Sequence, residues 1–248
     1  MGVSLTVADS KRAFHSAFPY VIAPMYRRLV DELLVELHLL SHQTGFQTDG
    51  LFAAGLTQVF DSFSKGYRPE SQREPLFQAL CSANGFHADA LRAQADQARQ
   101  QVGHHSLDEV KGWLSNQGQG APELIGTLLQ GVQRDDFHYS RLVAVGLLSL
   151  LQSAQGADAL DPQALRSAAH EIGDAMGLIK DRVDKDLSLY AGNLEKMSQA
   201  VELMEETVAA ERRKRERQQE AAAAAPSASE PTADAGGEAA TEAAPSAG

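Results

Sequence analysis

Titratable side chains crowd a leucine-rich stretch, MYRRLVDELLVELHLLS, at residues 25–41. Carboxylates and imidazoles at this density could bind a metal ion or act as a general acid and base. A dinuclear iron site in a helical bundle needs two Glu-x-x-His motifs and two further glutamates on facing helices. The chain offers Glu36-x-His38 here and Asp135-x-x-His138 elsewhere. This spacing does not fit a dinuclear metal centre.

A helical wheel gives the same charges a structural interpretation. At about 100° per residue the stretch has a broad apolar face and a second, narrower apolar stripe, with two charged rows between them. Oppositely charged residues four positions apart stabilise a helix by a few tenths of a kcal/mol when exposed. Each row contains its own counter-charge, so we predict that its members are structural: Arg28, Glu32 and Glu36 in one row, Arg27 and Asp31 in the other.

Other candidate catalytic or metal-binding residues lack the partners that such chemistry requires. His38 and His42 lie one turn apart and could share a metal ion, but no further ligand is evident in the sequence. Cys81 is the single cysteine, which excludes an intrachain disulfide and every multi-cysteine metal site. No glycine-rich serine turn or phosphate-binding loop is present. The sequence therefore predicts no enzymatic activity and no metal or other cofactor.

Composition restricts the class of partner. The formal net charge of -11 disfavours nonspecific binding to nucleic acid or to an anionic lipid surface, so any such contact must be local. The longest nearly unbroken apolar run, residues 142–151, is half the length of a membrane span, and the N-terminus lacks the apolar core of a secretory signal. We therefore expect a soluble protein that does not bind nucleic acid.

The elements that carry these residues are predicted to be helices. Thr6 or Asp9 can cap a first helix that Pro19 ends, and Pro24 can open the charged helix. Asp135 or Asp136 can cap the helix that contains residues 142–151. No alternating strand pattern extends beyond a few residues. The expected fold is all-α, a bundle of eight or nine helices over residues 1–180.

Beyond residue 180 the pattern becomes linear. Apolar residues alternate at spacings of three and four over residues 181–220, as in a long coiled-coil-like helix. This seam consists of Leu187, Tyr190, Leu194, Met197, Val201, Met204 and Val208. The Ala- and Pro-rich segment 221–248 offers little to bury, and we expect it to be disordered.

The seam is the best candidate for a partner-binding surface. Few charges flank it, so pairing with a second copy is poorly encoded, and the flexible thioethers of Met197 and Met204 suit a groove shared with another protein. The alternative is that the helix packs on its own bundle. The basic run at residues 211–220 is either a solvated helix end or a local contact with anionic headgroups or an acidic partner.

Four segments carry a family resemblance. TVADSKRAFHSAF, IAPMYRRLVDELLVELHLLS, FHYSRLVAVGLLSLL and KDLSLYAGNLEKMSQAVELM resemble, in order and spacing, the thylakoid formation protein family of cyanobacteria and plastids. The resemblance covers about residues 3–208. Ala191-Gly192 stands where the family usually has better helix formers, which puts the straightness of the long helix in doubt. No plastid transit peptide precedes the first motif, which favours a cyanobacterial chain.

The resemblance implies a function that the residues alone do not. It implies a non-enzymatic, all-helical accessory protein in photosystem II biogenesis and repair that associates with the FtsH protease complex. Such a protein would lie peripherally on the cytoplasmic side of the thylakoid membrane, or on the stromal side in a plastid. Two alternatives remain open at this point: a generic helical coiled-coil scaffold or adaptor, and a metal-dependent helical enzyme.

Overall fold

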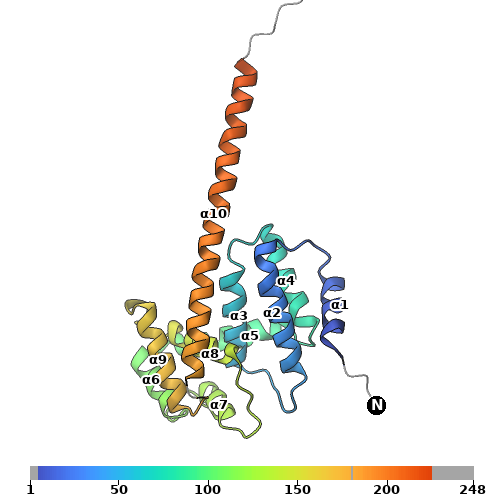
Figure 1. The fold of residues 1–248 in the computed structure, drawn as a ribbon. Helices are drawn as coiled ribbons and strands as arrows, with labels where there is room; N and C mark the ends of the chain where they lie inside the picture. The colour runs from blue at the N-terminus through green and yellow to red at the C-terminus, as the bar shows by residue number, and fades with distance from the viewer. Residues whose placement is uncertain (1–4, 180, 225–248) are drawn as a thin grey trace, which may run out of the picture. The chain divides into compact units, whose positions relative to one another are not determined.

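The protein is all-α, as predicted. The computed structural model describes residues 5–179 and 181–224, and within them it contains ten α-helices, two short 3₁₀ helices and no β-strand (Figure 1). The α-helices are α1 (Val7–Ala17), α2 (Pro24–Ser41), α3 (Gly50–Phe63), α4 (Arg73–Ser82), α5 (Ala88–Gly103), α6 (Leu107–Ser115), α7 (Glu123–Val132), α8 (Arg141–Ser153), α9 (Pro162–Ala175) and α10 (Arg182–Ala224). The 3₁₀ helices are η1 (Glu70–Gln72) and η2 (Ala157–Ala159).

Contacts between residues divide the chain into two compact units, with the boundary between Glu202 and Leu203. The boundary therefore falls inside α10 and not at residue 180, because the first part of α10 packs on the bundle and belongs to the first unit. The helix predicted over 181–220 runs to Ala224. Most of the segment predicted to be disordered, 221–248, lies outside the described residues.

Local capping accounts for several helix starts. Thr6, one of the two predicted candidates, is the N-cap of α1 and forms a reciprocal capping box with Asp9. Pro24 occupies the first turn of α2, as predicted. The predicted start of α8 was wrong. The helix begins at Arg141 with Ser140 as its N-cap, and Asp136 instead forms an ion pair with Arg134 at 2.6 Å.

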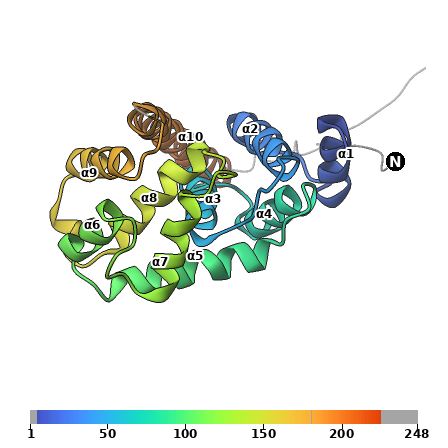
Figure 2. The same ribbon diagram turned by 90° about the horizontal axis from the view of Figure 1, so that it is seen from below.

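The core of the first unit is built on the crossing of α3 and α8, with α5 packed against both (Figure 2). The backbones approach most closely at Gly55 of α3 and Gly146 of α8. A methyl group at Gly55 would collide with the carbonyl oxygen of Leu142, and one at Gly146 would collide with that of Leu51. Only glycine permits this distance between the two helices.

A largely buried cation joins the same three helices. Arg99 of α5 donates from Nη2 to the carbonyl oxygen of Ala54 at 2.9 Å and to Oγ1 of Thr57 at 2.8 Å, both on α3. Its Nε donates to Oγ of Ser149 on α8 at 3.0 Å. Burial lowers the pKa of the guanidinium, which nevertheless stays charged because an arginine starts from so high a value. The side chain thus satisfies polar groups at the centre of the crossing.

Candidate partner-binding surface

The charged rows of α2 were the first candidate site, and the structure pairs most of their members. Nε of Arg28 lies 2.7 Å from Oε1 of Glu32, the predicted pair within one row. The wheel predicted that Asp31 would pair with Arg27, but the structure shows a different partner. Asp31 lies 3.2 Å from Nζ of Lys11 on α1, because α1 packs along this side of α2 and brings a closer cation.

Arg141, at the N-terminus of α8, completes the row of Arg28, Glu32 and Glu36. Its Nε lies 2.6 Å from Oε2 of Glu36, and its Nη1 lies 3.3 Å from Oε2 of Glu32. Burial raises the pKa of Glu36, whose side chain is 16% exposed, and the nearby Arg141 offsets part of that rise. Burial acts in the same direction on Glu32, but hydrogen bonds from Arg28 and Arg141 outweigh it and lower its pKa. These contacts tie α2 to α8.

A second polar contact fixes the start of α10. Oη of Tyr139, in the segment before α8, donates to Oδ2 of Asp186 at 2.9 Å, and Nε of Arg182 lies 3.3 Å from the same oxygen. Burial and the adjacent carboxylate of Asp186 raise the pKa of the Tyr139 phenol, so the tyrosine remains a hydrogen-bond donor at physiological pH. The first turn of α10 is thereby held beside the bundle.

The first part of the predicted seam packs on the bundle. Leu187 is 1% exposed and belongs to the core. The ring of Tyr190 meets that of Phe63 edge-on at 5.7 Å between centroids, and its hydroxyl lies 3.1 Å from Oγ of Ser62. Met197 is partly buried against the core. These side chains stabilise the first unit, so a partner could use only the parts of them that remain exposed.

Val201 closes this packed part of the seam. Its Cγ1 would lie 2.6 Å from a β-carbon placed on Gly66, which follows α3 and has a positive φ of 84°. Leu194, between Tyr190 and Met197 along the seam, is half-buried. The helix also continues through Ala191 and Gly192 without a break, so the expected weakening there does not interrupt it.

The rest of the seam belongs to the second unit. Val208 is 60% exposed and Met204 is half-buried. Leu203, which the predicted seam does not include, is 65% exposed. The sequence did not mark Leu203 as a candidate for partner binding, because it lies outside the spacing of three and four that defines the seam. Three large apolar residues within six positions of one helix form the best candidate surface for a protein partner.

The histidine pair of α2 is held by hydrogen bonds. Nδ1 of His38 lies 2.9 Å from Oγ of Ser10 on α1, and Nδ1 of His42 lies 2.8 Å from the carbonyl oxygen of His38. The two rings are 4.2 Å apart between centroids. Across residues 5–179 and 181–224, no three His, Cys, Asp or Glu residues gather closely enough to form a metal site.

Comparisons with known proteins agree with the arrangement of these helices. The family model described as thylakoid formation protein matches residues 6–219. The chain belongs to the thylakoid formation protein family. Among its relatives, Protein Thf1 of Prochlorococcus marinus (strain MIT 9313) is 56% identical over 207 residues, which are 83% of this chain and 85% of the relative. Protein Thf1 of Synechococcus sp. (strain CC9605) is 52% identical over 213 residues, 85% of this chain and 92% of the relative.

A solved structure supports the same assignment. The structure of Psb29 is similar with a TM-score of 0.73 and 36% sequence identity, over 85% of this chain and 98% of that one. The match to the thylakoid formation protein family includes the bundle and most of α10, so both the packed and the exposed parts of the seam lie inside it. The family is named for thylakoid formation and not for a catalysed reaction. Of the helices in the described part of the chain, none has the length and apolar character needed to cross a membrane.

Proposed function

We propose that the protein is a non-enzymatic accessory factor in photosystem II biogenesis and repair, and that it binds and stabilises the FtsH protease complex. In this role it associates peripherally with the cytoplasmic face of the thylakoid membrane. Family membership supports a role in thylakoid formation. The observation that carries the proposal of a protein partner is the uncovered apolar surface of the second unit, formed by Leu203, Met204 and Val208.

The exposed part of the seam suits a helical partner better than the packed part does. Met204 and Val208 lie one turn apart with Leu203 on the adjoining side, and such side chains can enter a groove in another protein to whose shape methionine adapts. Uncovered apolar groups on a soluble protein are often covered by a partner in the assembled state. Tyr190 and Met197 already stabilise the first unit, so replacing them would mix loss of binding with loss of folding.

Copurification tests the proposal. Replacing Leu203, Met204 and Val208 together with glutamine, a good helix former, removes the apolar surface while keeping α10 helical. We expect at least a tenfold loss of FtsH recovered with the tagged protein from detergent-solubilised thylakoids. Far-UV circular dichroism and the melting temperature should stay at the parental values, because none of the three residues is buried.

A matched control replaces three exposed apolar residues of the first unit, Val21, Leu39 and Ile179, with glutamine. This variant loses a comparable amount of apolar surface and should recover FtsH as the parent does. If the folded second-unit variant recovers FtsH at the parental level, the partner surface lies elsewhere. If the parent itself recovers none, FtsH is not the partner, and a scaffold or adaptor role that does not involve the protease becomes the better hypothesis.

A further inference from the structure

Basic residues gather in the second unit of an otherwise acidic protein. Residues 211–220 hold five of the 22 Lys and Arg residues of the chain but only three of its 33 Asp and Glu residues. The chain as a whole carries a formal net charge of -11. Charge interactions decay over about 8 Å at physiological salt, so an anionic surface close to this segment interacts mainly with its own charges. The segment can therefore attract an anionic surface that the average surface of the protein repels.

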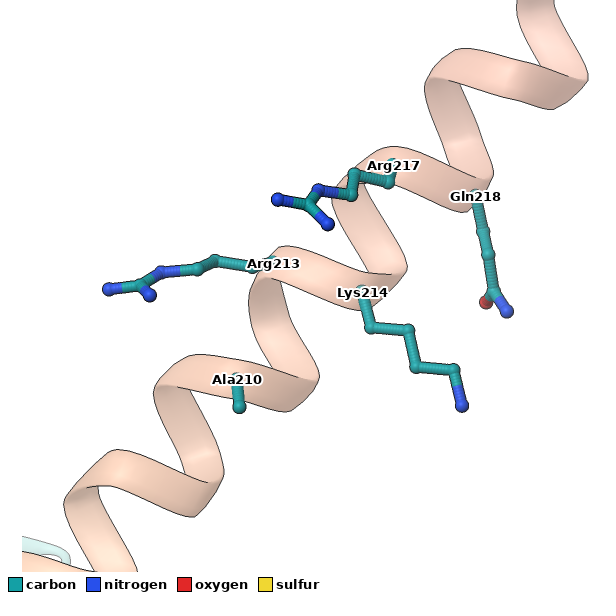
Figure 3. Close-up of a pocket in the computed structure, with 5 residues that line it drawn as sticks. All are labelled: Ala210, Arg213, Lys214, Arg217 and Gln218. Atoms are coloured by element: carbon teal, nitrogen blue, oxygen red, sulfur yellow. The ribbon is translucent and has the colours of Figure 1, made fainter.

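Three of the five cations of this segment share one side of α10. Figure 3 shows Arg213 and Arg217 projecting to the same side, one helical turn apart, with Lys214 extending from the adjoining side. At about 1.5 Å of rise per residue, the first two lie about 6 Å apart along the helix. Ala210 and Gln218 complete this surface, which we call the cationic face. All five side chains are exposed.

Carboxylates border the cationic face without lying among its three cations. Glu216 lies about 60° around the helix from Arg213, and its Oε1 is 2.9 Å from Nε of Arg212. Glu211 lies roughly 100° around the helix from Ala210. Glu206 and Glu220 lie on the same side as the face, but Glu206 precedes Ala210 by one turn and Glu220 follows Arg217 by three residues, so the three cations occupy the stretch between them. No ion pair of the described residues involves Arg213, Lys214 or Arg217.

Helix stability does not account for this arrangement. Like charges four positions apart, such as Arg213 and Arg217, destabilise a helix by a few tenths of a kcal/mol. Cations offset the helix dipole only in the last turn, and α10 continues to Ala224 with no basic residue in its last turn. The cationic face therefore has a small intrinsic cost that an anionic ligand would offset.

The composition of the face distinguishes between two classes of anionic partner. Protein interfaces depend on a few buried aromatic or large aliphatic anchors, and the only apolar side chain here is the methyl group of Ala210. A lipid surface needs no such anchor, because each Lys or Arg near anionic headgroups contributes on its own. We propose that the cationic face of α10 binds the anionic headgroups of a lipid membrane. This proposal rests on the peripheral membrane association in the proposed function, and it assigns that association to Arg213, Lys214 and Arg217.

Vesicle sedimentation tests the proposal with the full chain. The parent should bind vesicles of phosphatidylcholine containing one third phosphatidylglycerol, but not vesicles of phosphatidylcholine alone, and the binding should fall as salt is raised. Each cation close to such a surface contributes roughly fivefold to partitioning. The triple variant Arg213→Gln, Lys214→Gln, Arg217→Gln should therefore bind the anionic vesicles about a hundredfold more weakly, with its helicity unchanged.

A control variant that removes the same number of cations distinguishes an effect of the cationic face from an effect of net charge. Arg27→Gln, Lys185→Gln and Lys196→Gln remove three exposed cations of the first unit and should leave vesicle binding at the parental level. The cationic-face variant should still recover FtsH from detergent extracts, which keeps this test independent of the protease. Parental vesicle binding by the cationic-face variant overturns the proposal. So does a parent that ignores anionic vesicles yet binds polyglutamate, since the occupant would then be an acidic protein segment.

Discussion

The crossing of α3 and α8 and the second-unit part of α10 are both helical, but they are stabilised in different ways. At the crossing, two glycines allow the backbones to meet, and Arg99 satisfies the buried polar groups between the helices. From Leu203 to Glu220 no side chain is buried, and the stretch contains exposed apolar and cationic residues. The first region therefore depends on packing, where side-chain volume is critical, and the second depends on the chemistry of its surface.

This difference predicts how each region tolerates substitution. A packed crossing responds to a single methyl group, because its neighbours cannot move away without disturbing further contacts. An exposed helix tolerates almost any good helix former, because its side chains touch mainly water. Stability measurements should therefore be sensitive to the first region and nearly insensitive to the second, whereas binding measurements should show the reverse.

The largest effect is expected at Gly146. Replacement by alanine places a methyl group against the carbonyl oxygen of Leu51 and forces α3 and α8 apart. Overpacking of this kind costs about 3 kcal/mol or more when the obstacle is backbone that cannot rotate away. Urea denaturation followed by circular dichroism would measure the loss.

Gly112 of α6 provides the matched control, because a methyl group there would meet nothing within 4 Å. Gly112→Ala should leave stability unchanged or raise it by roughly 0.5–1 kcal/mol, since alanine is the better helix former. Equal effects of the two substitutions would show that the close approach of α3 and α8 is not important for stability.

An intermediate effect is expected at Arg141. Arg141→Met removes the cation that faces Glu36 and should cost about 1–2 kcal/mol at pH 7, because a largely buried carboxylate loses its charged hydrogen-bond donor. Burial already raises the pKa of Glu36, and the variant raises it further. The folded state then binds that proton more tightly than the unfolded state, so the loss should shrink as the pH falls from 7 toward 5.

Arg28 gives the comparison for this test. Its side chain is exposed and pairs with Glu32 but not with Glu36. Arg28→Met should cost less than about 0.5 kcal/mol, as surface ion pairs usually do. Denaturation curves at pH 7 and pH 5 for both variants would reveal whether burial of the carboxylate makes the difference; equal losses at both sites would contradict it.

The smallest effect is expected at the end of the chain. Ending the protein after Arg217 removes the end of α10 and the Ala- and Pro-rich segment, whose composition offers little apolar surface to bury against the first unit. The melting temperature should not change. A clear drop would mean that residues beyond 217 contribute to the stability of the first unit, and would weaken the contrast between packed and exposed regions.

Local signals in the sequence predicted much of the helical structure. The Thr6 cap of α1 and Pro24 at the start of α2 act within one turn, so the residues that form them are visible together in the sequence. The prediction failed at the start of α8, where Asp136 had the right chemistry for a cap but was engaged by a neighbouring arginine. Competing local contacts of this kind are not resolved by residue type alone.

Contacts between distant residues could not be predicted. Glu36 and Arg141 are far apart in the chain, and nothing in either segment marks the other as its partner. The close approach at Gly55 and Gly146 depends on which helices meet, and glycine in an apolar helix does not identify its neighbour. Leu187 satisfies the spacing of an exposed seam and of a buried one equally well, so only the structure places it in the core.

The single thiol of the protein has a consequence for labelling experiments. Cys81 lies on α4, fully buried, and burial raises its pKa to about 12. Since the thiolate is the reactive form, the native protein should resist maleimides and form no mixed disulfide at neutral pH. A cysteine introduced anywhere on the surface of α10 would then be the sole attachment point for a spin label or a photocrosslinker, without prior removal of the natural one.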